Sequence, residues 1–190
     1  DLALIYSMKR ANAAAIYTKN LVKGAPLIVT KEHLADGKAQ AIICNSGNAN
    51  TCNPDGVKIA SSMCSLLAEE LAVSPEDVIV ASTGVIGRRL DIKPIKDAMP
   101  CLVKGLAEKS APAAEAIMTT DTRIKEAAVS FDIGGRECRI GGIAKGSGMI
   151  NPNMATMLAF LTTDCSISSP MLQKALQEDA EDTFNMISVD

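Results

Sequence analysis

The segment from Lys145 to Asp164, KGSGMINPNMATMLAFLTTD, constrains the fold more than any other part of the sequence. It opens with a glycine-rich turn and an Asn-Pro-Asn sequence, and the apolar and β-branched residues 157–163 then predict a buried strand. Thr156 therefore stands where a flexible turn meets the start of a strand. Its hydroxyl is well placed to attack a carbonyl, and the nearest one along the chain belongs to Ala155.

A threonine hydroxyl is a weak nucleophile until a base takes its proton. Cleavage of the Ala155–Thr156 bond would give Thr156 its own base, an α-amino group with a pKa of about 8. The cleavage would pass through an ester formed by an N-to-O acyl shift, which water hydrolyses. Lys145 would orient the hydroxyl or hold a substrate carboxylate. The same residues also fit an ordinary loop before a strand, because Gly, Asn and Pro favour turns and Thr is common in strands.

Polar groups also follow other predicted elements. Val78–Ser82 predicts a buried strand that ends at Thr83 and Gly84, whose hydroxyl and amide could bind an oxyanion. A plain glycine turn is the alternative there. The amide-rich segment Asn45–Asn50 either binds a ligand or bonds its own backbone, and Asx turns favour the second interpretation. Thr119–Thr122 places hydroxyls around one carboxylate after a predicted helix, a composition that often serves only as a cap.

Four segments occur along the chain in a fixed order: Cys44–Asn50 (CNSGNAN), Ala81–Gly87 (ASTGVIG), Met118–Thr122 (MTTDT) and Lys145–Asp164. In sequence and in order they resemble the ornithine acetyltransferase family, the ArgJ-type enzymes of arginine biosynthesis. The resemblance runs along essentially all 190 residues. It implies an α/β (α+β) layered sandwich with helices outside two stacked sheets, as in other N-terminal-nucleophile enzymes. Periodicity alone indicates only that helices and strands are mixed.

The resemblance implies an acetyltransferase that cleaves itself between Ala155 and Thr156. Thr156 would carry the acetyl group of N-acetylornithine to glutamate as an acetyl-threonine, releasing ornithine. Thr83 and Gly84 would form the oxyanion hole, and Thr122 and Lys145 would bind substrate with Thr156. No metal or bound cofactor is implied, although some members also accept acetyl-CoA as a co-substrate. The alternative is an N-terminal-nucleophile amidase or aminopeptidase of related fold, in which water resolves the acyl-enzyme.

Residues 1–190 are expected to form a single catalytic-type domain, a fragment of a longer chain. Further substrate-binding residues of the resembling family lie beyond Asp190. The implied partner is therefore the C-terminal part of the same precursor, in an α2β2 heterotetramer.

Composition and spacing argue against several other classes of function. A net charge of −3 without a basic run argues against nucleic acid as a partner. No apolar stretch approaches the ~20 residues of a membrane helix and no signal-peptide pattern opens the chain, so a cytoplasmic protein is expected. Nucleotide binding is disfavoured because Gly146 and Gly148 lack a third glycine at the dinucleotide spacing, and Lys145 precedes them.

The six cysteines contain no CxxC pair, which disfavours zinc and redox motifs. They are interpreted as small buried hydrophobic residues in a reducing compartment. The single histidine, His33, lies in a polar Lys-Glu-His sequence and is expected at the surface, which argues against Ser-His-Asp chemistry.

Hydrophobic periodicity and turn residues predict the remaining elements. Strands are expected over 1–7, 11–18, 26–30, 39–44, 126–133 and 138–144, with a further strand starting near 187. Helices are expected over 56–72, 91–105, 110–118 and 171–186.

Overall fold

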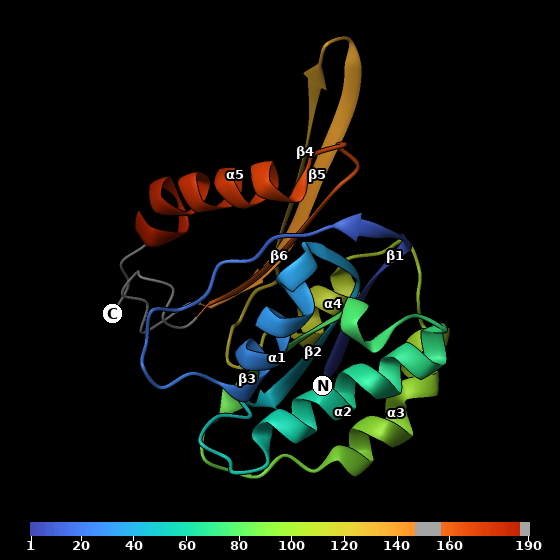
Figure 1. Ribbon diagram of the computed structural model, residues 1–190, viewed down its shortest axis with the longest axis vertical. Helices are drawn as coiled ribbons and strands as arrows, with labels where there is room; N and C mark the ends of the chain where they lie inside the picture. Colours follow the sequence, from blue (N-terminus) through green and yellow to red (C-terminus); the bar gives the residue numbers. More distant parts are fainter. Residues whose placement is uncertain (147–156, 187–190) are drawn as a thin grey trace.

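A computed structural model of the chain describes residues 1–146 and 157–186 (Figure 1). Its strands form two three-stranded sheets, with the order β1-β2-β3 in the first and β4-β5-β6 in the second. The strands are β1 (Leu2–Asn12), β2 (Lys38–Asn48), β3 (Val78–Val85), β4 (Lys125–Ile133), β5 (Arg136–Lys145) and β6 (Leu158–Thr163). The α-helices are α1 (Ala25–His33), α2 (Gly56–Leu71), α3 (Ile92–Lys104), α4 (Ala111–Ala116) and α5 (Ser169–Asp182). Short 3-10 turns are η1 (Leu34–Asp36), η2 (Pro75–Asp77) and η3 (Phe184–Met186).

The first sheet combines an antiparallel and a parallel pair. β1 runs antiparallel to β2, whereas β3 runs parallel to β2 and is reached through α2. The parallel register extends from Ala41 opposite Val78 to Asn48 opposite Val85. The second sheet is antiparallel throughout, with a Gly134-Gly135 turn between β4 and β5. The carboxyl ends of β2 and β3 therefore lie side by side.

The main hydrophobic core lies between the first sheet and helices α1, α2 and α3 (Figure 1). Ile43 on β2 and Val78 on β3 pack there with Met63 and Leu67 of α2, and all four are fully buried. Burying each such side chain contributes roughly 1.5–3 kcal/mol. The helical periodicity of the sequence predicts one apolar face with Ala60, Met63, Cys64, Leu67 and Leu71. The first four are among the buried residues of α2, and Leu71 is partly buried against the same core.

A second core joins the two sheets. Ala3 and Cys44 from the first sheet meet Ile143 of β5 and Ile117 after α4, and Leu158 and Phe160 of β6 pack against them. The sheets are thus stacked face to face, with α1, α2 and α3 outside the first sheet. The expected layered α/β sandwich is confirmed.

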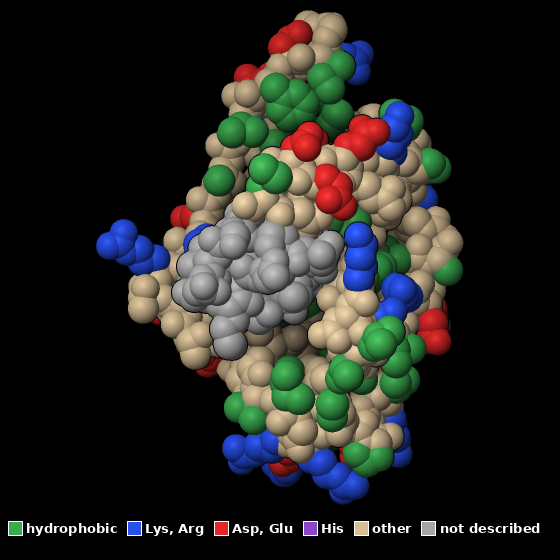
Figure 2. Space-filling view, turned by 90° about the vertical axis from the view of Figure 1, so that its left-hand side faces the viewer, with side chains coloured by type: hydrophobic (Ala, Val, Ile, Leu, Met, Phe, Trp, Pro, Cys, Tyr) green, Lys and Arg blue, Asp and Glu red, His purple; other side chains and the backbone are tan. Residues whose placement is uncertain are grey.

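The second sheet is buried at one end only. β4 and β5 project at one end of the long axis of the molecule, and hydrophobic side chains gather on this projection (Figures 1 and 2). Val129, Phe131 and Ile133 on β4 are exposed there. At the other end of β5, Ile143 and Lys145 are buried. Because these two residues are buried, the carboxyl end of β5 is anchored in the body of the protein.

Residues 26–30 are helical, so the strand predicted there is wrong. The β-branched run PLIVT resembles a strand locally, but Pro26 occupies the first turn of α1, and the buried positions Ala25, Pro26, Val29 and Thr30 recur with helical spacing. Thr30 Oγ1 donates to the Val80 carbonyl at 2.8 Å. The tertiary contact with β3 overrides the local strand preference.

Other boundaries also differ from expectation. Residues 13–18 are not a strand, since β1 ends at Asn12. β2 and β3 run on to Asn48 and Val85, because their parallel hydrogen-bonded ladder outweighs the turn preference of Asn and Gly. The helix predicted over 171–186 ends at Asp182 and is followed by η3. The strand predicted from residue 187 lies outside the described residues.

Two expectations about single residue types also need correction. Of the cysteines, only Cys44 and Cys64 are buried, while Cys52 and Cys101 are exposed. His33 is half-buried at the end of α1, where its Nδ1 lies 2.7 Å from the Val78 carbonyl oxygen and donates to it. Within the described residues, no helix has the length and apolar character needed to cross a membrane.

Candidate active site

Lys145 and Thr83 meet at the ends of two strands that belong to different sheets. Lys145 is the last residue of β5, and its side chain is carried into the interior with only 7% exposure. Its Nζ donates a hydrogen bond to Thr83 Oγ1 on β3 at 3.2 Å, across 62 residues of sequence. The structure therefore joins two of the residues that the sequence singles out.

This contact sets the chemistry of both groups. A largely buried ammonium group needs hydrogen-bond acceptors, and the Thr83 oxygen is one of them. Because that oxygen accepts from Lys145, the Thr83 hydroxyl keeps its own proton to donate to another oxygen. Cys44, nearby on β2, offers no competing nucleophile. Burial raises the pKa of its thiol to about 12, and the opposing influence of the Lys145 charge is smaller.

Gly84 follows Thr83 in a conformation that excludes a side chain. Its φ of 126° is in the region that favours glycine, and a Cβ added there would lie 2.3 Å from the carbonyl carbon of Gly47. Gly47 faces Gly84 in the β2–β3 register. The two strands approach this closely because neither residue has a side chain, and the Gly84 backbone stays exposed at the sheet end.

Asp121 connects the turn after α4 to the end of β5. It is 7% exposed, its Oδ2 accepts from the Gly146 N–H at 2.9 Å, and the same oxygen pairs with Lys125. Thr122 is the next residue and is exposed. The turn that carries Thr122 is thus held against the residues that carry Lys145. Sequence reasoning assigned no role to Asp121, although the carboxylate among threonines in MTTDT is the signal that would have found it.

The proposed nucleophile and cleavage junction lie outside the described residues. Ala155 and Thr156 are therefore not part of the geometry above. The flanking elements are described: Lys145 at the end of β5 pairs with Leu158 at the start of β6. The two ends of the intervening segment are consequently adjacent.

The Asn45–Asn50 segment serves the backbone. Asn45 Nδ2 donates to the Asn48 carbonyl at 2.7 Å, and Asn50 Nδ2 donates to the Gly56 carbonyl at 2.8 Å. Asn48 Nδ2 bonds the Arg88 carbonyl at 2.8 Å. These contacts support the structural interpretation of the motif: the amides bind β2 to the loops beside it.

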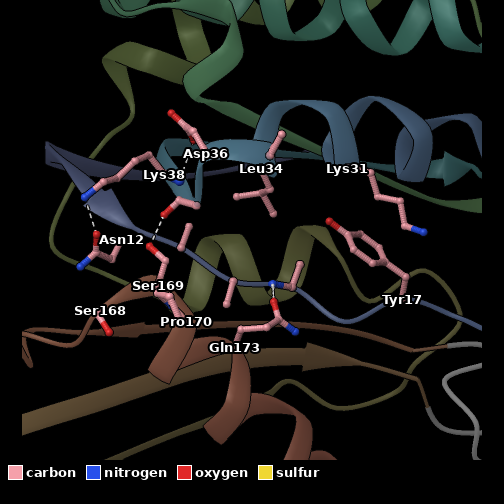
Figure 3. Close-up of a pocket in the computed structure, with 15 residues that line it drawn as sticks. Asn12, Tyr17, Lys31, Leu34, Asp36, Lys38, Ser168, Ser169, Pro170 and Gln173 are labelled. Carbon is pink, nitrogen blue, oxygen red and sulfur yellow. Dashed lines mark hydrogen bonds between the residues drawn. The ribbon is translucent and has the colours of Figure 1, made fainter.

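A cavity of about 530 Å³ lies elsewhere, between the C-terminal end of α1, the segment after β1 and the start of α5 (Figure 3). Its polar groups largely pair with one another: Lys38 bonds Asn12, Ser169 Oγ bonds the Gly37 carbonyl at 2.6 Å, and Gln173 accepts from the Ala15 amide. Of the residues predicted for the site, the four that the structure describes, Thr83, Gly84, Thr122 and Lys145, do not line this cavity. In the described part of the chain, no cluster of three His, Cys, Asp or Glu residues is arranged to hold a metal ion.

The model of the ArgJ family matches residues 1–190. The chain belongs to the ArgJ family. Among curated proteins, the arginine biosynthesis bifunctional protein ArgJ of Caldanaerobacter subterraneus is 48% identical over 192 residues, covering 100% of this chain and 48% of that protein. The ArgJ protein of Staphylococcus aureus is 49% identical, with 100% and 47% covered. The chain thus spans about half the length of these ArgJ relatives.

Solved ArgJ structures share the fold. The ArgJ protein of Bacillus halodurans matches with a TM-score of 0.76 and 41% identity, covering 82% of this chain and 83% of that one. An ornithine acetyltransferase of Mycobacterium tuberculosis, solved in complex with ornithine, matches with a TM-score of 0.70 and 32% identity, covering 80% of this chain and 82% of that one.

Proposed function

We propose that the protein is a glutamate N-acetyltransferase of arginine biosynthesis that works through an acetyl-threonine at Thr156, formed after self-cleavage at Ala155–Thr156. The observation that carries this proposal is the hydrogen bond between Lys145 Nζ and Thr83 Oγ1. It joins a buried cation to a hydroxyl donor beside the point where the chain enters the proposed cleavage segment.

Chain connectivity limits how far Thr156 can lie from these groups. Leu158 faces Lys145 in the β5–β6 ladder, and Thr156 is two residues before Leu158. Two residues of extended chain span about 7 Å at most. A nucleophile two residues before Leu158 would therefore be within reach of the region where Thr83 and Lys145 meet.

The oxyanion hole rests on the hydrogen-bond balance at Thr83. Its oxygen accepts from Lys145, so its proton is available to an oxyanion at the end of β3. The exposed backbone of Gly84 supplies a second donor in the proposal. Each such donor typically contributes about 3 kcal/mol of transition-state stabilisation.

The reaction then runs as a double displacement. The α-amino group of Thr156 takes the hydroxyl proton while Oγ attacks the acetyl carbon of N-acetylornithine. The carbon–nitrogen bond breaks, and the proton passes to the departing ornithine nitrogen. The amine of glutamate next attacks the acetyl-threonine ester and leaves as N-acetylglutamate, which restores the hydroxyl. No bound cofactor is needed, and acetyl-CoA would act only as an alternative acetyl donor.

Chain lengths support the cleavage. This chain covers about half of the length of the curated ArgJ proteins. Its match with the solved Bacillus halodurans chain covers 82% of this chain and 83% of the solved one, so these two chains are similar in length. The solved chain is therefore close to half the curated length.

Cleavage would leave the two pieces paired. β5 precedes the junction and β6 follows it, and their ladder runs from Ile140 opposite Thr163 to Lys145 opposite Leu158. We therefore expect the two fragments to remain one unit, with the fragment that begins at Thr156 as the second subunit. An α2β2 assembly of these fragments is expected, and native mass spectrometry measures it.

Intact mass spectrometry of the full-length protein with N-acetylornithine tests the proposal. We expect a fragment that begins at Thr156 and gains about 42 Da as its acetyl ester. The Thr156→Ala variant should remain a single chain on a denaturing gel. Acetyl transfer by a wild-type protein that stays uncleaved would contradict the self-processing step. Release of free acetate in place of N-acetylglutamate when glutamate is added would identify an amidase instead.

A further inference from the structure

Cys138 and Cys165 face each other across the second sheet. The β5–β6 register pairs Ile140 with Thr163, so one step of two residues along each strand places Cys138 opposite Cys165. Pairing continues this far, because the Asp164 amide donates to the Arg139 carbonyl at 3.3 Å. Arg139 and Asp164 thus lie opposite each other, with the Arg139 amide donating to Asp164 Oδ1 at 2.7 Å. The cysteines follow directly, Cys138 within β5 and Cys165 just after the end of β6, at a position equivalent to a non-hydrogen-bonded pair.

That position suits a covalent bond. In non-hydrogen-bonded antiparallel pairs the Cα atoms lie about 4.5 Å apart, within the range of roughly 4.4–6.8 Å found for disulfides. Both thiols are free and half-exposed. Their side chains interact directly, since the pKa of the Cys138 thiol is raised first by desolvation and then by the Cys165 thiol.

We propose that Cys138 and Cys165 form a reversible disulfide with a small-molecule disulfide as the oxidant. One cysteine thiolate attacks the oxidant and releases one thiol, leaving a mixed disulfide on the protein. The second cysteine attacks that mixed disulfide and releases the second thiol. The two cysteine thiols are oxidised by two electrons in total, and the oxidant is reduced to two thiols. A thiol in excess reverses the bond by the same exchange, which returns both cysteines to thiols.

The bond would link the two sides of the proposed cleavage junction. Cys138 precedes Ala155 and Cys165 follows Thr156, so oxidation would join the two fragments covalently. This consequence rests on the proposed self-cleavage, whereas the disulfide itself does not. A link between β5 and β6 would also hold the ladder that leads to Lys145.

Peptide mapping of the full-length protein after treatment with oxidised glutathione tests the bond. Trypsin cuts after Arg136 and Arg139, so Cys138 is released in the short peptide 137–139. We expect this peptide to be linked to the peptide that contains Cys165, with an intact-mass loss of about 2 Da. Dithiothreitol should restore the original mass. Linkage of Cys138 to glutathione or to another cysteine, or no linkage at all, would overturn the proposal.

Variants sharpen the result. Cys138→Ser and Cys165→Ser should each abolish the linked peptide. The matched control is Cys101→Ser, which replaces an exposed cysteine and should leave the linked peptide unchanged. Circular dichroism checks that each variant is folded. For the wild type, oxidation should protect both cysteines together from iodoacetamide, and protection of one alone would also overturn the proposal. If the Cys165 peptide begins at residue 146 rather than 156, self-cleavage fails while the disulfide stands.

Discussion

Lys145 Nζ donates to Thr83 Oγ1 at 3.2 Å, and this bond connects the two stacked sheets at the candidate site. Thr83 lies on β3 of the first sheet and Lys145 ends β5 of the second. A change at either residue should therefore alter the chemistry of the other without removing a large part of either hydrophobic core.

Thr83→Ala should slow acetyl transfer while leaving the fold intact. The variant removes a hydroxyl donor from the proposed oxyanion hole, and such a loss costs about 10²–10³ in kcat. Thr83→Ser keeps the hydroxyl and is the matched control that should retain most of the activity. Steady-state kinetics with N-acetylornithine and glutamate measure both variants. Equal rates for Ala and wild type would show that the oxyanion is bound elsewhere.

Lys145→Met should weaken substrate binding and slow turnover with a modest effect on stability. Methionine fills the apolar volume of the lysine stem at this largely buried position but removes the charge that bonds Thr83. KM for the substrates and the melting temperature are the measurements. Lys174→Met on α5, where the lysine is exposed in an i,i+4 pair, is the control and should change neither.

Asp121→Asn should destabilise the protein and retard self-cleavage. The substitution removes the negative charge that accepts from the Gly146 amide and pairs with Lys125, at a cost of about 1–3 kcal/mol. Asp97→Asn breaks an exposed ion pair with Lys93 and should cost less than about 0.5 kcal/mol. Urea unfolding and the rate of appearance of two bands on a gel report the two effects. Equal stabilities and equal cleavage rates in the two variants would show that the contacts of Asp121 contribute no more than an exposed ion pair does.

Gly84→Ala should be much more damaging than Gly87→Ala. Both glycines have positive φ, but a Cβ at Gly84 would meet the Gly47 backbone at 2.3 Å, whereas Gly87 has open space around it. At Gly87 the positive φ alone lowers the stability by about 1 kcal/mol when alanine is introduced. At Gly84 the same backbone strain is present, and the clash with Gly47 also forces the paired strands β2 and β3 apart. Thermal unfolding of both variants measures the difference, and similar melting temperatures would contradict the close approach of β2 and β3.

Stability should fall at alkaline pH through the buried thiols. Burial raises the pKa of both Cys44 and Cys64 from 9.0 to about 12, so the unfolded chain loses these protons at a lower pH than the folded protein. The stabilising effect is complete below pH 9 and is lost as the pH rises towards 12. Urea unfolding at pH 8 and above measures this loss. Cys64→Ala should show a shallower decline, whereas Cys101→Ala at an exposed position should follow the wild type.

Elements with clear local signals were predicted well. The apolar face of α2 repeats with helical spacing, and its buried residues match that face. The helix expected over 91–105 is found as α3 over Ile92–Lys104, and Asp91 caps it by accepting from the Lys93 amide. The strands expected over 126–133 and 138–144 are found as β4 and β5, because two adjacent glycines, Gly134 and Gly135, favour the hairpin that joins them.

Elements that depend on distant partners were predicted poorly. Residues 26–30 have the composition of a strand and become part of α1 because Val29 and Thr30 are buried against the first sheet. Thr83 and Gly84 were expected in a turn, but the ladder with β2 keeps them in β3. Local propensity differs by about 1 kcal/mol between such states, and tertiary packing outweighs it.

The sequence by itself determined the family, because four specific motifs in order do not depend on knowing how they come together. It also singled out Thr83 and Lys145 as candidate site residues through those motifs. Only the tertiary structure decided that the two side chains meet, that Asp121 holds the Gly146 amide, and that Cys138 faces Cys165. The physical reason is that stacking of the sheets through Cys44 and Ile143, and the register of β5 on β6, arise from long-range packing that local periodicity does not encode.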